Sequence, residues 1–254
     1  MEQSEQVRRL TGFAWTDLAD VLCDQRQYDE AEAACQAGLE IKEELGDTRG
    51  MAVITGQLGT LAWRQGALTE AEERYKKSLA FFHSINEPAS ESVFWYQLGM
   101  VYQDAEQWDA AEQVYRLAAR LKEEQGLLGG SNGAGASWDQ LAQVCEATGR
   151  KAEAEQWYGK ALAAFQGADD RPNAARALSN LASLLTDDPA RLDEARRLAE
   201  ESLAIKETLD PAAMEIWTTY AILARIAEQQ GDESRAAAYR SKAERAFAPY
   251  SGGE

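Results

Sequence analysis

One short pattern recurs six times along this 254-residue chain, and it constrains the fold more than any other feature. A leucine followed by glycine or alanine returns every 40 to 43 residues, as Leu18-Ala19, Leu58-Gly59, Leu98-Gly99, Leu141-Ala142, Leu181-Ala182 and Leu223-Ala224. Each pair is followed 13 or 14 residues later by an alanine, namely Ala31, Ala71, Ala111, Ala154, Ala195 and Ala236. Because a period of this length marks stacked structural units, the chain is predicted to be a repeat array.

Each unit is predicted to contain two helices. The third unit carries Trp95, Leu98, Gly99 and Tyr102 at the i, i+3, i+4, i+7 spacing of one helix face. A glycine inside a helix costs about 1 kcal/mol relative to alanine, so a bulky side chain is expected against Gly99. Tyr115 on the second helix is the candidate. We therefore predict twelve helices in antiparallel pairs, with turns near residues 26, 66, 106, 149, 187 and 231.

The motif W-x2-LG-x2-Y followed by A-x3-Y in residues 95–115 resembles the tetratricopeptide repeat (TPR) signature. A usual TPR unit has about 34 residues. The longer units of this chain are similar to those of kinesin light chains, the spindle adaptor Pins and bacterial regulatory arrays, and residues 177–185 and 194–209 carry that likeness. The resemblance implies an all-α fold, a right-handed α-solenoid of six TPR helical hairpins, that binds other proteins.

We expect residues 1–247 to form a single TPR array, followed by a disordered tail at 248–254. The expected units are about 8–47, 48–87, 88–130, 131–170, 171–210 and 211–247. The stretch GLLGGSNGAGAS at 126–137 contains five glycines and is interpreted as a long connection between the third and fourth units. A phosphate-binding loop is the alternative, although the GK[ST] motif and a preceding strand are both missing.

The charge balance disfavours two classes of partner. The chain has 43 acidic and 26 basic residues, a net charge of −17, which repels nucleic acid and anionic lipid. The first ten residues contain no apolar signal region, and no apolar run approaches the length of a membrane span. We therefore expect a cytoplasmic protein with no nucleic acid or membrane partner.

The residues that commonly carry chemistry point to structure instead. Cys23, Cys35 and Cys145 occupy predicted helix positions without a CxxC motif, so they are interpreted as structural thiols. His83 is the only histidine and is expected on the surface. No convergent catalytic set is visible, and we expect no enzyme activity, no metal and no other cofactor.

The inner surface of such an array is lined by first helices, and four successive units place an amide there: Gln57, Gln97, Gln140 and Asn180. An amide both donates and accepts, which suits the backbone of an extended peptide. In kinesin light chain and Pins repeats, asparagines on this surface bind peptide in that way, so the resemblance implies the same role here. The alternative is that glutamine simply favours a solvated helix face.

Further candidates for a peptide-binding groove on the same surface are Asp20, Trp63, Tyr96, Met100, Gln143 and Arg225. Acidic residues near the amide row, Asp17, Asp20, Asp139 and Glu146, outnumber Arg64, Arg176 and Arg225, which favours a basic and apolar ligand. TPR proteins that bind acidic chaperone C-terminal tails need Lys and Asn at fixed inner positions. Those positions here hold Thr16, Asp20 and Gln57, so such tails are not expected.

These observations favour a non-enzymatic scaffold for protein–protein interaction that binds a peptide or protein segment in its concave groove. The alternative is a sensor or regulatory TPR module of a larger signalling ATPase or caspase-like protease system.

Overall fold

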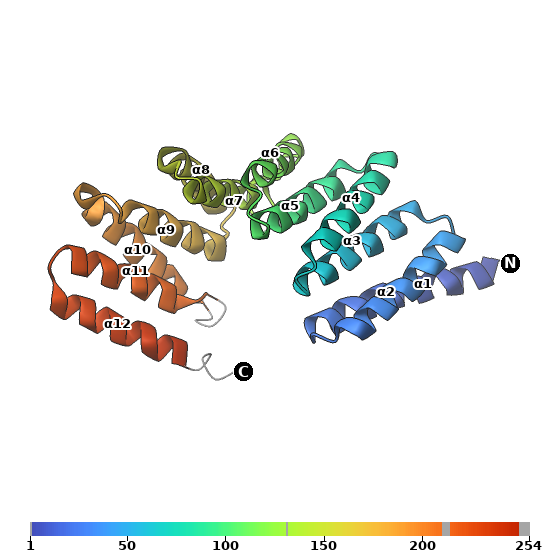
Figure 1. Cartoon of the computed structure of the whole chain (residues 1–254), viewed down its shortest axis with the longest axis horizontal. Helices are drawn as coiled ribbons and strands as arrows, with labels where there is room; N and C mark the ends of the chain where they lie inside the picture. The colour runs from blue at the N-terminus through green and yellow to red at the C-terminus, as the bar shows by residue number, and fades with distance from the viewer. Residues whose placement is uncertain (1, 131, 210–213, 249–254) are drawn as a thin grey trace. The chain divides into compact units, whose positions relative to one another are not determined.

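The computed structural model describes residues 2–130, 132–209 and 214–248. Over these residues the chain forms twelve α-helices and one short 3-10 helix, without any strand (Figure 1). The helices pair as antiparallel hairpins, as predicted. The all-α architecture of six hairpins is thereby confirmed.

Contacts between residues divide the chain into two compact units, Met1–Gln125 and Gly126–Glu254, each built from three hairpins. The helices of the N-terminal unit are α1 (Glu2–Asp24), α2 (Tyr28–Glu44), α3 (Thr48–Arg64), α4 (Leu68–Ser84), α5 (Pro88–Asp104) and α6 (Trp108–Glu124). Those of the C-terminal unit are α7 (Ala134–Ala147), α8 (Lys151–Gly167), α9 (Arg171–Leu185), η1 (Pro189–Arg191), α10 (Leu192–Lys206), α11 (Ile216–Gln229) and α12 (Glu233–Phe247). In both units, the second helix of one hairpin packs on the first helix of the next.

The turns inside the hairpins lie where the sequence predicts them. Gly66 and Gly149 have φ angles of 78° and 77°, a left-handed conformation that glycine adopts without a steric penalty. Arg26 and Glu106 adopt the same conformation at the equivalent turns, with φ angles of 60° and 56°. The fifth hairpin differs, because η1 (Pro189–Arg191) leads into α10. The left-handed turn conformation therefore recurs at these four turns, although only two of them carry a glycine.

The glycine of the recurring pair lies against an aromatic ring of the second helix. A Cβ atom added to Gly99 would come 2.4 Å from Cε1 of Tyr115, and one added to Gly59 would come 2.9 Å from Cδ1 of Tyr75. Both tyrosines are fully buried. This confirms the expected contact between Gly99 and Tyr115, which closes the third hairpin.

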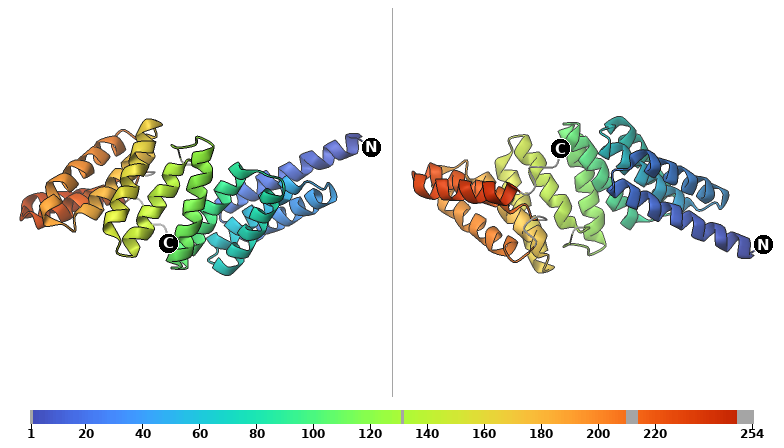
Figure 2. Two further views of the ribbon diagram at one scale, coloured as in Figure 1. Left: turned by 90° about the horizontal axis from the view of Figure 1, so that it is seen from above. Right: turned by 90° about the horizontal axis from the view of Figure 1, so that it is seen from below.

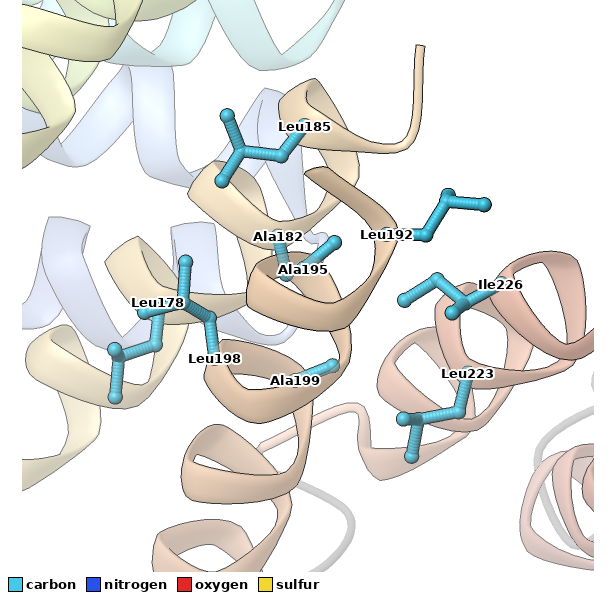
Figure 3. Close-up of a cluster of buried hydrophobic side chains, with 9 residues drawn as sticks. All are labelled: Leu178, Ala182, Leu185, Leu192, Ala195, Leu198, Ala199, Leu223 and Ile226. Carbon is cyan, nitrogen blue, oxygen red and sulfur yellow. The ribbon is translucent and has the colours of Figure 1, made fainter. Parts of the chain in front are cut away.

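Leucines and alanines fill the space between successive hairpins. In the C-terminal unit, Leu178 and Leu185 of α9 contact Leu192 and Leu198 of α10, and Leu223 of α11 joins the same cluster (Figure 3). The alanines that open the second-helix pattern are buried in all six hairpins: Ala31, Ala71, Ala111, Ala154, Ala195 and Ala236. The core is thus a thin layer between helix pairs, as a solenoid requires.

The first hairpin departs from the repeat pattern. Leu18 is 41% exposed, whereas Leu58 and Leu98 at the equivalent positions are buried. The reason is that no described helix packs on this face of α1, whereas α2 covers α3 and α4 covers α5. The helix is also longer than its neighbours, with 23 residues, and its start extends beyond the rest of the unit in both views of Figure 2.

The glycine-rich stretch forms a connection up to Gly133, and α7 begins at Ala134, so residues 134–137 are helical instead of belonging to the loop. The backbone N–H groups of Ala134 and Gly135 donate to the carbonyl oxygens of Leu127 and Leu128, both at 2.8 Å. The loop therefore already occupies amides that a phosphate-binding loop would offer to its ligand. This geometry favours the connection over the ligand loop.

Candidate ligand-binding surfaces

In the N-terminal unit, the predicted amide of Gln57 is tied to an acidic neighbour. Its Nε2 donates to Oδ1 of Asp20 at 2.7 Å, while its Oε1 is buried and has no hydrogen-bond partner among the described residues. Both side chains line a cavity of about 310 Å³ between α1, α2 and α3. Gln97 on α5 is half-buried and makes no side-chain hydrogen bond to any described residue. The complete amide of Gln97 thus remains for a ligand, whereas both polar atoms of the Gln57 amide are engaged or buried.

The small cavity is acidic on one side. Partial burial raises the pKa of Asp20, and the nearby carboxylates of Asp17 and Asp24 act in the same direction, against the hydrogen bond from Gln57. Arg64 donates to Oδ1 of Asp24 at 3.1 Å and to the carbonyl oxygen of Cys23 at 3.3 Å. One arginine therefore faces several carboxylates, and a cationic ligand would relieve their repulsion.

The predicted apolar anchors of the N-terminal unit are half-buried. Trp63 donates from Nε1 to Oδ2 of Asp104 at 2.6 Å, so its indole face is what remains for a ligand. The Tyr96 ring lies 5.7 Å from that of Tyr115 between centroids. Met100 is half-buried on the same helix as Tyr96. Each of these side chains thus keeps part of its apolar surface exposed.

In the C-terminal unit, two predicted residues meet at a buried carboxylate. Asp139 of α7 is completely buried, and its oxygens accept from Nε2 of Gln143 at 3.1 Å and from Nδ2 of Asn180 at 3.4 Å. Nε of Arg176 lies 3.6 Å from the same carboxylate. Burial raises the pKa of Asp139, although Arg176 and the two amides oppose that shift.

This network corrects the expectation that Asp139 faces the ligand as an exposed acid. The carboxylate is covered because α9 packs over this part of α7 and brings Arg176 and Asn180 onto it. The amide donors of Gln143 and Asn180 are consequently engaged, while their oxygens accept no hydrogen bond from a described residue. Asp139 positions these side chains and does not contribute a free negative charge.

A cavity of about 990 Å³ lies next to this network, bounded by side chains of α7, α9, α10, α11 and α12. Gln143 and Asn180 form part of its wall. Two other predicted residues lie elsewhere: Gln140 is half-buried on α7, and Arg225 donates to the carbonyl oxygen of Ser183 at 2.8 Å and to Thr186. The size is at the upper end of the range for ligand pockets.

Sequence reasoning missed three side chains of this wall, Lys206, Trp217 and Phe247. A signal for the lysine was present, because one position near the end of the second helices alternates between lysine and phenylalanine. The series is Lys42, Phe82, Lys122, Phe165, Lys206 and Phe247, with spacings of 40 to 43 residues. The first five of these residues are buried. A lysine at a position that otherwise holds a buried phenylalanine was therefore a sign of a buried amine.

Two of the three cysteines and the single histidine lie where the sequence predicts them. Cys35 and Cys145 are buried as predicted, and burial raises the pKa of the Cys35 thiol to about 12, which suppresses its reactivity. The His83 side chain is 84% exposed and thus lies on the surface as expected, with its Nδ1 3.3 Å from Oε1 of Glu91.

Within the described residues, no cluster of His, Cys, Asp or Glu has a geometry suited to a metal ion. No described helix has the length and apolarity that a membrane crossing requires.

Structural comparison finds similar solenoids among solved proteins. BtubC (BKLC) from P. vanneervenii matches with a TM-score of 0.75 and 23% identity, over 91% of this chain and 93% of that protein. The STAND protein PH0952 from Pyrococcus horikoshii, a signal transduction ATPase with a tetratricopeptide repeat sensor, matches with a TM-score of 0.78 and 20% identity. That match covers 94% of this chain and 36% of the ATPase.

Aspartyl phosphate phosphatase F from Bacillus subtilis matches with a TM-score of 0.73 and 16% identity, over 97% of this chain and 62% of that protein. At these identities the likeness concerns the fold alone. Comparison with curated protein sequences gives no match.

The family profile of the tetratricopeptide repeat matches residues 10–83, 91–167 and 135–208, which together span most of the chain. The matched segments contain both glycine–tyrosine contacts and the buried alanines of the first five hairpins. The chain therefore belongs to the tetratricopeptide repeat family.

Proposed function

We propose that this protein is a non-enzymatic scaffold that binds a peptide or protein segment along the surface of its first helices. The observation that carries the proposal is the cavity of about 990 Å³ in the C-terminal unit, whose wall includes the predicted residues Gln143 and Asn180. Their unsatisfied amide oxygens offer acceptors to the N–H groups of a peptide backbone. Trp217 and Ile222 are half-buried and add apolar surface to the same wall.

The N-terminal unit supports a preference for basic and apolar side chains. Asp17, Asp20 and Asp24 gather near Gln57, where the single arginine Arg64 balances only part of their charge. Trp63, Tyr96 and Met100 in the same unit accept an apolar anchor. Complementary charge mainly accelerates association and selects among partners, so this preference concerns specificity more than affinity.

The test is to fill the cavity without removing any of its polar contacts. Ala221 is exposed on α11 and lines the cavity, so Ala221→Trp places an indole inside it. Ala163→Trp, on an exposed position of α8 outside the cavity, is the matched control. Peptides selected from a random display library on the unmodified protein are then titrated against both variants.

We expect Ala221→Trp to abolish binding of the selected peptides and Ala163→Trp to leave it unchanged. Equal affinity for both variants, with helical content preserved, would contradict a ligand site in this cavity. Failure to select any peptide would contradict peptide binding itself.

The amides of the first helices are tested separately. A neutral hydrogen bond contributes about 0.5–1.5 kcal/mol, so Gln97→Ala is expected to weaken binding by about tenfold at most. The double variant Gln97→Ala/Gln140→Ala should weaken it further. An unchanged affinity in the double variant would show that these two amides only face solvent.

A sensor module is the second candidate function. It is favoured by the likeness to the STAND protein from Pyrococcus horikoshii, in which a tetratricopeptide repeat sensor is joined to an ATPase. In this role the same surface would bind a signal and pass its presence to an effector domain. The mass of the native protein in its source cells discriminates between the two, because a sensor module requires a polypeptide longer than this chain.

A further inference from the structure

Lys206 is a buried lysine that lines the cavity of the C-terminal unit. Its side chain is 97% buried, since only 3% of the residue is exposed, yet it lines the cavity of about 990 Å³. Its ammonium group has no hydrogen bond, ion pair or aromatic ring partner among the described residues, and only the charges of Glu215 and Arg176 act on it. A buried charge without a partner costs several kcal/mol, and such a cost is typical of functional sites.

The two lysines at the same repeat position in the N-terminal unit differ in this respect. Nζ of Lys42 lies 3.0 Å from Oδ2 of Asp47 and 3.9 Å from the centre of the Phe13 ring. Nζ of Lys122 lies 4.9 Å from the centre of the Tyr96 ring. Both amines therefore have partners within the N-terminal unit, a carboxylate and a ring for Lys42 and a ring for Lys122.

In the fifth hairpin the equivalent covering residues are replaced. Tyr96 lies two residues before the recurring Leu98, and the residue two before Leu181 on α9 is Ser179. Phe13 lies five residues before Leu18, and the residue five before Leu181 is Arg176. The small serine leaves space next to Lys206, and the arginine adds a second cation to the cavity wall. The site thus combines an open volume with two positive groups.

Three carboxylates lie near this pair and balance part of its positive charge. Nε of Arg176 is 3.6 Å from Asp139 of α7, a long contact, and Arg176 and Glu215 are the charged groups whose fields act on Lys206. Glu215, before α11, is exposed to solvent, and Glu244 of α12 also lines the cavity. The rings of Trp217 and Phe247, with centroids 5.5 Å apart, line the same cavity. Its wall therefore combines two cations with two aromatic rings.

We propose that this cavity binds a carboxylate group adjacent to an apolar side chain, with Lys206 and Arg176 as its cationic partners. The ammonium and guanidinium groups pair with the carboxylate. The rings of Trp217 and Phe247 contact the apolar side chain next to the carboxylate. The carboxylate comes from the C-terminus of the bound segment or from an Asp or Glu side chain, and to that extent the inference rests on the proposed function. The preference for basic side chains concerns the N-terminal unit, so the two selectivities are compatible.

Three small probes test the inference by NMR titration: N-acetylphenylalanine, N-acetylphenylalaninamide and the α-amide of N-acetylglutamate. The first carries an α-carboxylate, the second has no charge, and the third has a side-chain carboxylate. We expect one or both acids to bind at least about tenfold more tightly than the neutral amide, as a hydrogen bond to a charged group implies. The stronger acid identifies the source of the carboxylate.

The variant Lys206→Met removes the charge while keeping a side chain of similar length, and Lys122→Met is the matched control in the other unit. We expect Lys206→Met to lose the preference for the acid and Lys122→Met to retain it. Arg176→Gln should weaken acid binding as well. Equal binding of acid and neutral probes by the unmodified protein, or acid binding unchanged in Lys206→Met, would overturn the proposal.

The pH profile supplies a readout that a purely structural lysine would not produce. Burial lowers the pKa of Lys206 to about 8, so its amine loses the charge as pH rises above that value. Acid binding should therefore weaken between pH 7 and pH 9 in the unmodified protein and vary little in Lys206→Met. A flat profile in the unmodified protein would contradict the role of Lys206.

The peptide titrations and the Lys206→Met variant together show which of the two proposals fails. If library peptides bind and Ala221→Trp blocks them while Lys206→Met has no effect, the peptide site stands and the carboxylate role fails. If neither peptides nor acids bind, both proposals fail.

Discussion

At the scale of single residues, hairpin closure depends on a glycine backbone that meets a tyrosine ring. Gly99 lies inside α5, and its hydrogen atoms leave just enough space for the buried ring of Tyr115 on α6. Any side chain at this place must displace the ring or the helix. A helical glycine elsewhere in the chain, Gly159 of α8, has no atom within 4 Å of its potential Cβ and carries no such constraint.

These two glycines provide a matched pair of substitutions. Gly99→Ala should destabilise the protein by about 1–2 kcal/mol, because a cost of about 1–3 kcal/mol for overpacking exceeds the gain in helix propensity. Gly159→Ala should stabilise it by about 0.5–1 kcal/mol, because only the gain remains. Urea denaturation followed by circular dichroism measures both. A stabilising Gly99→Ala would show that the Tyr115 ring moves aside without cost.

Lys206 affects stability as well as the proposed ligand site. Burial lowers its pKa from 10.5 to about 8, so the folded chain releases this proton at a lower pH than the unfolded chain does. Below pH 8 folding must bury a charged amine, and this penalty disappears as pH rises from 8 to about 10.5. At pH 7, Lys206→Met is therefore expected to unfold with a free energy about 1–3 kcal/mol higher than the unmodified protein.

The difference in unfolding free energy between Lys206→Met and the unmodified protein should shrink as pH rises toward 10.5. The amine is then neutral in the folded protein and increasingly neutral in the unfolded chain. Denaturation curves at several pH values between 7 and 10.5 measure it. A gap that stays constant over this range would mean that Lys206 has an ordinary pKa in the folded protein.

At the scale of helices, α1 differs from every other first helix. Val7, Leu10, Phe13, Leu18 and Val21 are exposed along it, and the equivalent faces of α3 and α5 are covered by α2 and α4. The same repeat position thus has a different environment at the start of the array. Burial follows from the neighbouring helix and not from the residue type.

Substitution at one repeat position in two hairpins tests this difference. Leu18→Gln should change the unfolding free energy by no more than about 0.5 kcal/mol, as is usual for exposed positions. Leu58→Gln, at a position only 5% exposed, should cost about 2–5 kcal/mol through lost packing and a buried amide. Equal costs for the two would show that a further element covers α1 in solution.

At the scale of the whole molecule, each of the two units has a hydrophobic core of its own. Ala34, Leu39, Ile54 and Leu58 form such a cluster in the N-terminal unit, and the cluster of Figure 3 lies in the C-terminal unit. In repeat proteins, stability is the sum of contributions from single units and from contacts between neighbours. About three repeats are sufficient for a stable array, which is what each unit contains.

We therefore expect residues 1–125 and 126–254, expressed separately, to fold as helical proteins. Their circular dichroism spectra should sum to that of the whole chain, and each should unfold cooperatively in urea. A fragment that is unfolded by itself would show that its unit depends on the other one.

The sequence by itself determined the repeat, the helix pairs, their turns and the glycine–tyrosine contacts. These features follow from helical spacing and from contacts within a hairpin, such as that between Gly99 and Tyr115, whose partners are close in the chain. The candidate amides were also identified from the sequence by their register. Their hydrogen bonds to Asp20 and Asp139 were not, because these partners are 37 and 41 residues away.

Only the tertiary structure decided which charged and apolar side chains are covered. A repeat pattern treats equivalent positions as identical, whereas burial depends on the particular residues that three different helices bring together. Asp139 is buried because α9 places Arg176 and Asn180 over it, and Leu18 is exposed because no described helix packs on its face of α1. Lys206 faces an open cavity because Ser179 and Arg176 stand where the other lysines have aromatic rings.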